Sequence, residues 1–223
     1  MGLGTSRSEN RIYLSVGFGK IRQKTMENGV RVTAETPNAV KRTTQQGGDT
    51  WALEFDFIEG IIENIFYKED ANYGNSFEVI IRDALDLYQI SFPDDSRFWF
   101  DLMKRLPNVK LTEKLKIKTF DFKDKDGKRI AGLRIEQNGV QTPSYYDEKQ
   151  NDKWVLLHGY PTAEGLNWKD KDELKIYLIN VKKFLKNQFS QLILPKFGEK
   201  EHTETHVAEQ EPIPPIEEDD LPF

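Results

Sequence analysis

The last seven residues of the chain combine two kinds of side chain that proteins use to bind one another. Carboxylates at positions 217 to 220 come directly before an apolar Leu-Pro-Phe end, which also carries the terminal carboxylate. An aromatic ring joined to a carboxylate can enter an apolar pocket while its oxygens bind Arg or Lys. Acidic residues also keep proteins soluble, but solubility does not explain the apolar end. The residues expected to bind partner proteins are Asp219, Asp220, Leu221, Pro222 and Phe223.

A second set of residues has the chemistry needed to bind a nucleic-acid strand of any sequence. Such binding uses cations for the phosphates and aromatic faces for the bases, and stacking contributes roughly 1 to 3 kcal/mol per base. The candidates for phosphate contact are Lys20, Arg22, Lys41, Arg42, Arg82, Lys116, Lys118 and Arg134. The candidates for base stacking are Tyr13, Trp51, Tyr73 and Tyr88.

Some of these candidates have a structural alternative. Trp51 opens a predicted strand, where a ring packs in the core as often as it stacks on a base, and the pair Lys41 and Arg42 could be a solvated loop. Tyr13 and Tyr88 alternate with the apolar positions of their strands, which favours exposure. Acidic residues also face outward on the strands that follow Trp51. The binding groove is therefore expected toward the first strand, its loop and the last two strands, or only part of the acidic face binds.

Catalytic and metal-binding residues are scarce. His158 is the only histidine before residue 196, cysteine is absent, and no Gly-Lys-Ser/Thr phosphate loop occurs. His202 and His206 are four residues apart but have no further Cys or His nearby, so we interpret them as solvated. We expect neither an enzyme nor a bound cofactor or metal.

The charge of the chain is divided unequally. Residues 196 to 223 hold nine acids and two lysines, whereas residues 1 to 195 hold 30 Lys and Arg against 28 Asp and Glu. The net charge of the whole chain is therefore negative although residues 1 to 195 are slightly cationic. A negative net charge does not exclude a nucleic-acid partner. The proline-rich acidic segment has too little apolar content to fold, so the sequence predicts that it is disordered.

The candidate residues depend on strands for their positions. Apolar residues alternate over 12 to 18, over 51 to 67 and over 77 to 87, which predicts three strands. Residues 23 to 50 lack this pattern and form a predicted loop. The segment from Glu69 to Asn75 is short enough to join the second and third strands as a hairpin.

The second half of the chain adds two helices and two strands. Asp94, Asp95 or Ser96 can cap a helix that runs to Pro107. Strands are predicted over 114 to 122 and 129 to 137, joined by a tight turn at 125 to 128. A last helix from about Asp170 to Gln191 has an apolar face that would pack on the strands, with a dimer interface as the alternative.

Three strands, one helix and two strands is the order of the OB-fold, which binds oligonucleotides. We therefore expect a mainly β protein: a five-stranded antiparallel barrel with a helix between strands 3 and 4 and an added C-terminal helix. The expected organisation is a flexible N-terminus at 1–10, the OB-fold domain with its C-terminal helix at 11–195, and the acidic tail at 196–223.

An OB barrel followed by an acidic tail ending in Asp219 to Phe223 resembles the single-stranded DNA-binding proteins of bacteria and their phages. Tails of that family end in several acids followed by Ile or Leu, Pro and Phe. The bacterial members have a shorter body and a longer linker rich in Gly, Pro and Gln. The added segment after Asn138 is more similar to phage-encoded members.

This resemblance implies a protein that coats single-stranded DNA without sequence specificity during replication, recombination and repair. The tip would recruit replication and recombination proteins, and assembly into a homo-oligomer is compatible with it. The alternatives are an OB-fold that binds RNA and a scaffold that binds protein. No apolar run approaches the roughly 20 residues that cross a bilayer, so we expect no membrane association and a cytoplasmic protein, in the host cell if the gene is a phage's.

Overall fold

A computed structural model describes residues 11–26, 29–43, 47–71, 74–84, 86–151 and 153–197 of the chain. Several predictions lie outside these residues: the flexible N-terminus, the stacking candidate Tyr73, the solvated His202 and His206, and the disordered tail beyond Phe197 with its tip from Asp219 to Phe223.

The described residues form twelve strands, two α-helices and two short 3-10 helices. The strands are β1 (Arg11–Gly17), β2 (Lys20–Gln23), β3 (Val40–Thr43), β4 (Asp49–Phe55), β5 (Phe57–Lys68), β6 (Ser76–Asp83), β7 (Asp86–Pro93), β8 (Leu115–Lys123), β9 (Arg129–Gln137), β10 (Val140–Gln141), β11 (Asp147–Gln150) and β12 (Lys153–Leu156). The helices are α1 (Arg97–Arg105), η1 (Leu106–Asn108), α2 (Lys171–Leu192) and η2 (Leu194–Lys196).

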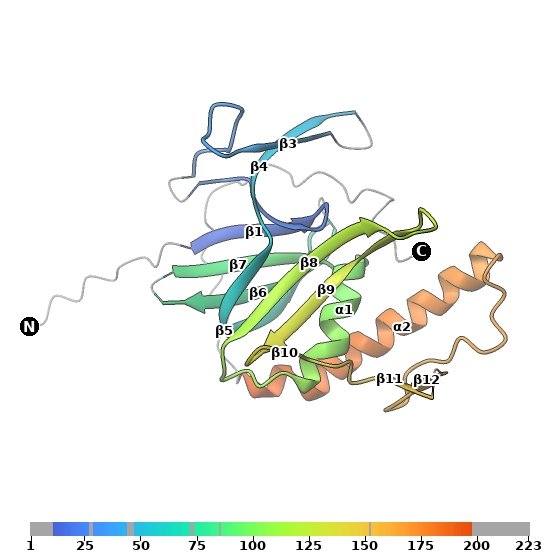
Figure 1. Cartoon of the computed structure of the whole chain (residues 1–223). Coiled ribbons are helices and arrows are strands. Elements are labelled where there is room, and N and C mark those ends of the chain that lie inside the picture. Colours follow the sequence, from blue (N-terminus) through green and yellow to red (C-terminus); the bar gives the residue numbers. More distant parts are fainter. Residues whose placement is uncertain are drawn as a thin grey trace, which may run out of the picture.

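The predicted five-stranded OB barrel is wrong. Ten strands form one sheet in the order β10-β9-β8-β5-β6-β7-β1-β2-β4-β3, with β10 and β3 at its open ends within the described residues. The sheet is mixed because β1 runs parallel to β7 while the other neighbours are antiparallel. Strands β11 and β12 form a separate hairpin beside the helices (Figure 1).

The strand count differs because two predicted strands are divided in the structure and because β2 and β3 lie outside the predicted strands. The segment 51 to 67 breaks at Asp56 into β4 and β5, which occupy distant places in the sheet order, so the sheet curls strongly between them. The segment 77 to 87 is a hairpin of β6 and β7 that turns near Ala84. The predicted loop 23 to 50 contains β3, and β2 follows β1 after a turn at Phe18 and Gly19.

Other local predictions are confirmed. Ser96 caps α1 by accepting a hydrogen bond from the backbone N–H of Trp99 at 3.2 Å, and the chain leaves helical geometry after Pro107 and Asn108. Residues 124 to 128 turn between the antiparallel strands β8 and β9. Helix α2 covers the predicted segment and is capped by Asp170.

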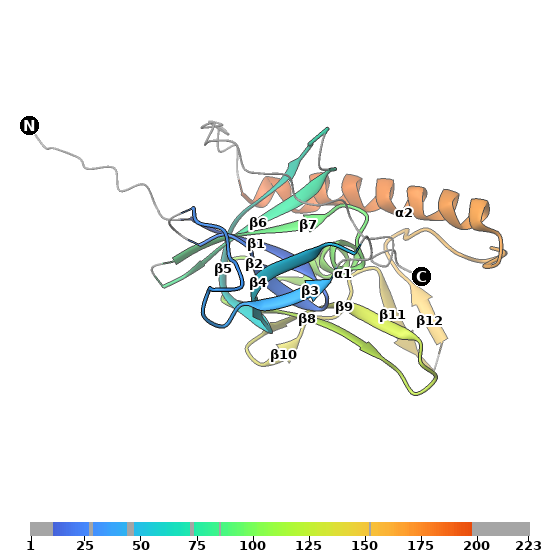
Figure 2. The ribbon, with the colours of Figure 1, turned by 90° about the horizontal axis from the view of Figure 1, so that it is seen from above.

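The core lies between one face of the sheet and the two helices. Register places Phe77 and Val79 of β6 directly across from Phe92 and Ile90 of β7, so these side chains share the buried face. The ring of Phe189 in α2 packs edge-on against Phe77 at 5.0 Å. Figure 2 shows α2 along one side of the molecule and the β8–β9 hairpin on the other. The helices thus leave one face of β5, β8 and β9 uncovered.

Hydrogen bonds to Asp94 connect α2 to the sheet. Its carboxylate is buried and accepts hydrogen bonds from Lys182 at 2.6 Å, from Lys186 at 2.7 Å and from the hydroxyl of Tyr67 at 3.0 Å. Burial alone would raise the pKa of Asp94, but the bonds from the two lysines hold it below its usual value. Asp94, one of the three residues considered for the cap of α1, therefore joins β5, β7 and α2, while Ser96 caps the helix.

Neither helix of the described part has a stretch long and apolar enough to span a membrane.

Candidate nucleic-acid interface

The uncovered face of β5, β8 and β9 aligns one aromatic and two cationic residues in a row. Phe57 lies directly across from Lys118, and Lys118 lies directly across from Arg134. Residues directly opposite in neighbouring strands point to the same side of a sheet, and strands are roughly 4.8 Å apart. The three side chains therefore form a row about 10 Å long. Phe57, at one end of this row, is 48% exposed.

Two further rings continue this surface along β8. Phe120 lies across from Gly132 and Phe122 lies across from Ile130. The two rings are 5.9 Å apart, and Phe122 is 50% exposed. We define the β5–β8–β9 face by its six aromatic and cationic residues: Phe57, Lys116, Lys118, Phe120, Phe122 and Arg134.

Cations and rings alternate on this face. The Nζ atom of Lys116 lies 4.5 Å from the ring centroid of Phe57, and the guanidinium of Arg134 lies 5.2 Å from that of Phe120. Contacts of this kind contribute about 0.5 to 1 kcal/mol at exposed sites. They hold the charged groups next to rings, which is the arrangement that a base and its phosphate require.

Carboxylates balance part of this charge. Lys116 lies between Glu59 and Glu136 in register and pairs with Glu59 at 2.7 Å, while Lys118 pairs with Glu136 at 2.9 Å. The hydrogen bond from Lys116 lowers the pKa of Glu59, so this carboxylate is charged at neutral pH. Exposed ion pairs contribute only about 0 to 1 kcal/mol, so an incoming phosphate can replace the carboxylates at little cost.

Arg134 differs from the two lysines. It is exposed, and it forms no ion pair with any of the described residues. Three cations against Glu59 and Glu136 leave the face with one net positive charge.

The turn between β1 and β2 lies against the opposite side of β8, because the residues that contact it, Thr119 and Asp121, alternate with Lys118, Phe120 and Phe122. The hydroxyl of Thr119 donates a hydrogen bond to the carbonyl of Gly19 at 2.9 Å, which fixes the turn against β8. Gly19 has a φ of 67°, and a Cβ there would lie 2.5 Å from Cβ of Asp121, so only glycine fits. Lys20 follows directly and pairs with Asp56, which stands between the exposed rings of Phe55 and Phe57.

Arg22 and Arg42 lie around Glu54 rather than on this face. The Glu54 side chain is 6% exposed and accepts two hydrogen bonds from Arg42, at 3.0 and 2.7 Å, while Arg22 approaches it at 3.3 Å. Both guanidinium groups also lie over the ring of Phe18. Arg22 is buried, so its guanidinium is enclosed by the protein and is not placed to contact a phosphate.

Lys41 and Trp51 lie on the β3–β4 hairpin, which projects from one end of the sheet (Figure 1). They are directly across from each other, and Lys41 also pairs with Asp49 at 2.6 Å. Trp51 is half-buried. These two candidates are therefore on another element than the β5–β8–β9 face.

The remaining candidates are dispersed. Tyr13 is exposed on β1, and Arg82 on β6 pairs with Glu63 of β5. Tyr88 was expected to point away from the apolar side of its strand, but this is wrong: register places it beside Ile81, and it packs against the core. The structure thus brings together Lys116, Lys118 and Arg134 from the predicted set, whereas Lys20 lies on the β1–β2 turn and pairs with Asp56.

Sequence reasoning missed the rings at this site. Phe57 lies within the apolar alternation over 51 to 67, which predicts one continuous strand, whereas the structure breaks this segment at Asp56. Positions 116, 118, 120 and 122 read Lys, Lys, Phe and Phe on one side of a strand whose other side begins with the apolar residues Leu115 and Ile117. That alternation is the signal that could have identified Phe120 and Phe122.

Within the described part of the chain, no three His, Cys, Asp or Glu side chains are grouped closely enough to hold a metal ion. No protein-family model matches the sequence, and neither curated proteins nor solved structures give a significant match. Any functional conclusion therefore depends on the geometry of the face and on the sequence of the tip.

Proposed function

We propose that the protein binds single-stranded DNA, without sequence preference, on the β5–β8–β9 face. The observation that carries this proposal is the row of Phe57, Lys118 and Arg134 across three strands, continued by Phe120. Exposed rings accept any base, because every base has a π face, and cations between the rings bind the phosphates. Stacking on exposed rings also favours a single strand, whose bases are free to leave a stack.

The acidic tip supplies the second half of the proposal. The resemblance of Asp219 to Phe223 to the tips of single-stranded DNA-binding proteins supports a role in recruiting replication and recombination proteins. Phe223→Ala should then abolish binding to such partners while leaving the affinity of the β5–β8–β9 face for DNA within about twofold.

A protein-binding scaffold is the second candidate. The observations in its favour are the apolar exposure of Phe55, Phe57 and Phe122 and the pairing of Lys116 and Lys118 with carboxylates. A protein partner would use the rings and leave the ion pairs intact. Such a partner would bind with little dependence on salt.

The test is a titration of the full chain against a fluorescently labelled oligo-dT strand, followed by anisotropy at several salt concentrations. A duplex and an RNA strand of the same length serve as comparisons. DNA coating predicts preference for the single DNA strand and a log-affinity slope near −0.7 per phosphate neutralised. Absence of binding, or equal affinity for the duplex, would reject the proposal and favour the scaffold. RNA binding with greater affinity than DNA would reassign the substrate.

A further inference from the structure

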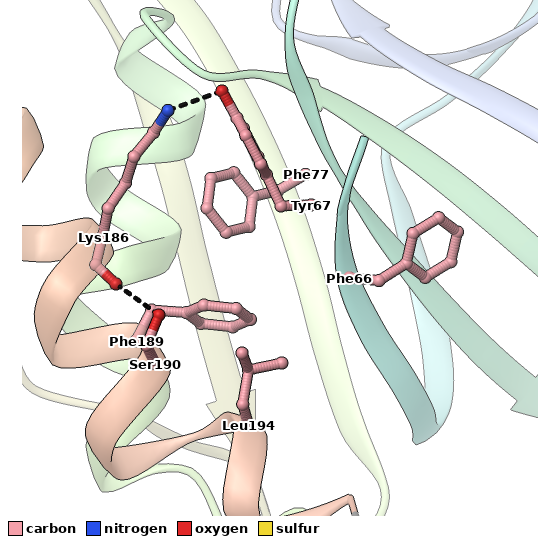
Figure 3. A pocket seen from close by; sticks show the side chains of 7 residues that line it. All are labelled: Phe66, Tyr67, Phe77, Lys186, Phe189, Ser190 and Leu194. Carbon is pink, nitrogen blue, oxygen red and sulfur yellow. Dashed lines mark hydrogen bonds between the residues drawn. The ribbon is translucent and has the colours of Figure 1, made fainter. Parts of the chain in front are cut away.

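Helix α2 packs on the sheet through one side and leaves its other side exposed. The side that faces the sheet buries Val181, Leu185 and Phe189. Figure 3 shows the end of this side, where Lys186 and Phe189 line a pocket of about 340 Å³ together with residues of the sheet. In the first half of the helix, from Lys171 to Asn180, no residue is buried. This half is therefore accessible to another molecule.

Two aliphatic residues lie at the centre of the exposed side. Ile176 and Ile179 are 61% and 42% exposed. Asp172 and Lys183, both exposed, lie about one turn before and one turn after this pair. The spacing of four, three and four residues places the four side chains along one face of the helix, opposite Val181. We call Asp172, Ile176, Ile179 and Lys183 the exposed stripe of α2.

The two charges at the ends of the stripe differ from other charges of the helix. Neither Asp172 nor Lys183 forms an ion pair with another residue of the described part of the chain. By contrast, Lys182 and Lys186 both pair with the buried carboxylate of Asp94. The stripe therefore presents an apolar centre between a negative charge at one end and a positive charge at the other.

This pattern is complementary to itself when two copies of the helix run in opposite directions. About a twofold axis that passes between Tyr177 and Leu178, position 172 faces position 183, and position 176 faces position 179. Each aspartate then meets a lysine of the other copy, and each isoleucine meets an isoleucine. A parallel pair would place aspartate against aspartate and lysine against lysine, and such contacts between like charges are repulsive. The stripe thus favours an antiparallel pair.

We propose that the protein forms a homodimer through the exposed stripe of α2. The isoleucines of both copies form the centre of the interface, and Asp172 pairs with Lys183 of the second copy on either side of it. A second copy fits better than an unrelated protein, because one surface supplies both halves of the complementary pattern. The overlap of twelve residues is about 17 Å long, so the interface is small and a micromolar affinity is expected.

This inference does not depend on what the β5–β8–β9 face binds. Helix α2 and the β8–β9 hairpin lie on opposite sides of the molecule (Figure 2). The dimer therefore leaves the β5–β8–β9 faces of both copies uncovered.

The test is sedimentation equilibrium of the full chain without nucleic acid, at concentrations from about 1 to about 200 μM. We expect the native chain to pass from monomer to dimer in this range. Ile179→Gln should weaken the dimer at least about tenfold, because the residue enters the interface once from each copy. Leu156→Gln on β12 is the matched control, since Leu156 is 41% exposed against 42% for Ile179, and should leave association unchanged.

Reversal of charge tests the direction of the two helices. Asp172→Lys and Lys183→Asp should each weaken association at least about fivefold, because two repulsions replace two ion pairs. A chain with both substitutions should recover the dimer, and so should an equimolar mixture of the two single variants. The control is Lys171→Asp, which makes the same change of charge at an exposed position outside the stripe and should have no effect.

Recovery in the mixture would also show that the single variants remain folded. A native chain that stays monomeric over the whole range would overturn the inference, and so would a dimer that Ile179→Gln leaves unchanged. Association of the mixture without association of the doubly substituted chain would indicate a parallel pair and would reject the arrangement proposed here.

Discussion

The guanidinium of Arg134 lies 5.2 Å from the centroid of the Phe120 ring. The ring reaches this position because Phe120 lies directly across from Gly132, where an added Cβ would be 2.7 Å from its Cζ atom. Glycine at 132 thus allows the ring to lie over β9, next to the cation that forms no ion pair among the described residues. The most exposed charge of the face and one of its rings are therefore positioned together.

Arg134→Gln should weaken binding to single-stranded DNA about tenfold. The substitution removes one charge-assisted contact to a phosphate, worth about 1.5 kcal/mol. It should also make the log-affinity slope against log salt shallower by about 0.7. Anisotropy titrations at four salt concentrations measure both effects. Lys175→Gln, on the exposed side of α2, is the control and should change neither. An unchanged slope in Arg134→Gln would show that no phosphate binds there.

Phe57→Ala should reduce the affinity between about fivefold and a hundredfold, because it removes a ring on which a base stacks. Phe57→Trp should restore or increase the affinity. The ring is 48% exposed, so little loss of folding stability is expected. Trp168→Ala removes another exposed ring, 63% exposed, in the turn before α2 and serves as the control. Equal losses in Phe57→Ala and Trp168→Ala would contradict a role specific to Phe57.

Glu59→Gln should increase the affinity for DNA about threefold. The carboxylate pairs with Lys116 at 2.7 Å, so its removal leaves the lysine available to a phosphate and adds one net positive charge to the face. The increase should be largest at low salt. The same titrations test this expectation, with Glu164→Gln on an exposed loop as the control. A decrease in affinity would indicate that Glu59 positions Lys116 rather than competing with the phosphate.

Asp94→Asn should lower the free energy of unfolding by about 2 kcal/mol at neutral pH, because it leaves two lysines of α2 without their carboxylate. The pKa of Asp94 is held below its usual value by Lys182 and Lys186, against the effect of burial. A lowered pKa gives stability that is present above the unfolded value near 3.9 and is lost as the pH falls through the folded value.

The difference in stability between the native chain and Asp94→Asn should therefore shrink below about pH 4. Urea denaturation between pH 3 and 7 measures it. Asp126→Asn, in the exposed turn between β8 and β9, should behave like the native chain throughout. A difference that stays constant with pH would contradict the ion pairs at Asp94.

The local elements of the fold could be predicted because their signals are local. Ser96 ahead of an amphipathic segment, and the Asp-Gly pair at 126 and 127, each determine a cap or a turn through neighbouring residues alone. The order of strands in the sheet depends on contacts between distant residues. The break at Asp56 could not be predicted, because apolar residues continue to alternate with a period of two from Phe55 to Phe57 across it. The barrel was predicted for this reason, and the open sheet was not.

The candidate site could be predicted only in part, because some of its signals are local and others depend on contacts between distant residues. Lys116, Lys118 and Arg134 could be assigned to outward positions, because the strand period determines the face. Their neighbours could not be assigned, since Glu59 and Lys116 are 57 positions apart in the chain and meet only through the pairing of β5 with β8. The same pairing brings Phe57 beside Lys118. The apolar alternation of its segment favours a core position for Phe57, whereas in the structure its ring is part of the exposed face.

The central claim is that the β5–β8–β9 face binds single-stranded DNA, and direct crosslinking tests it best. Oligo-dT in which one thymine is replaced by 5-iodouracil can be irradiated with the full chain, and the crosslinked residues identified by mass spectrometry. We expect crosslinks to Phe57, Phe120 or Phe122, reduced in Arg134→Gln and suppressed by high salt. Crosslinks confined to Trp51, Trp154 or Trp168, on other elements, would contradict it.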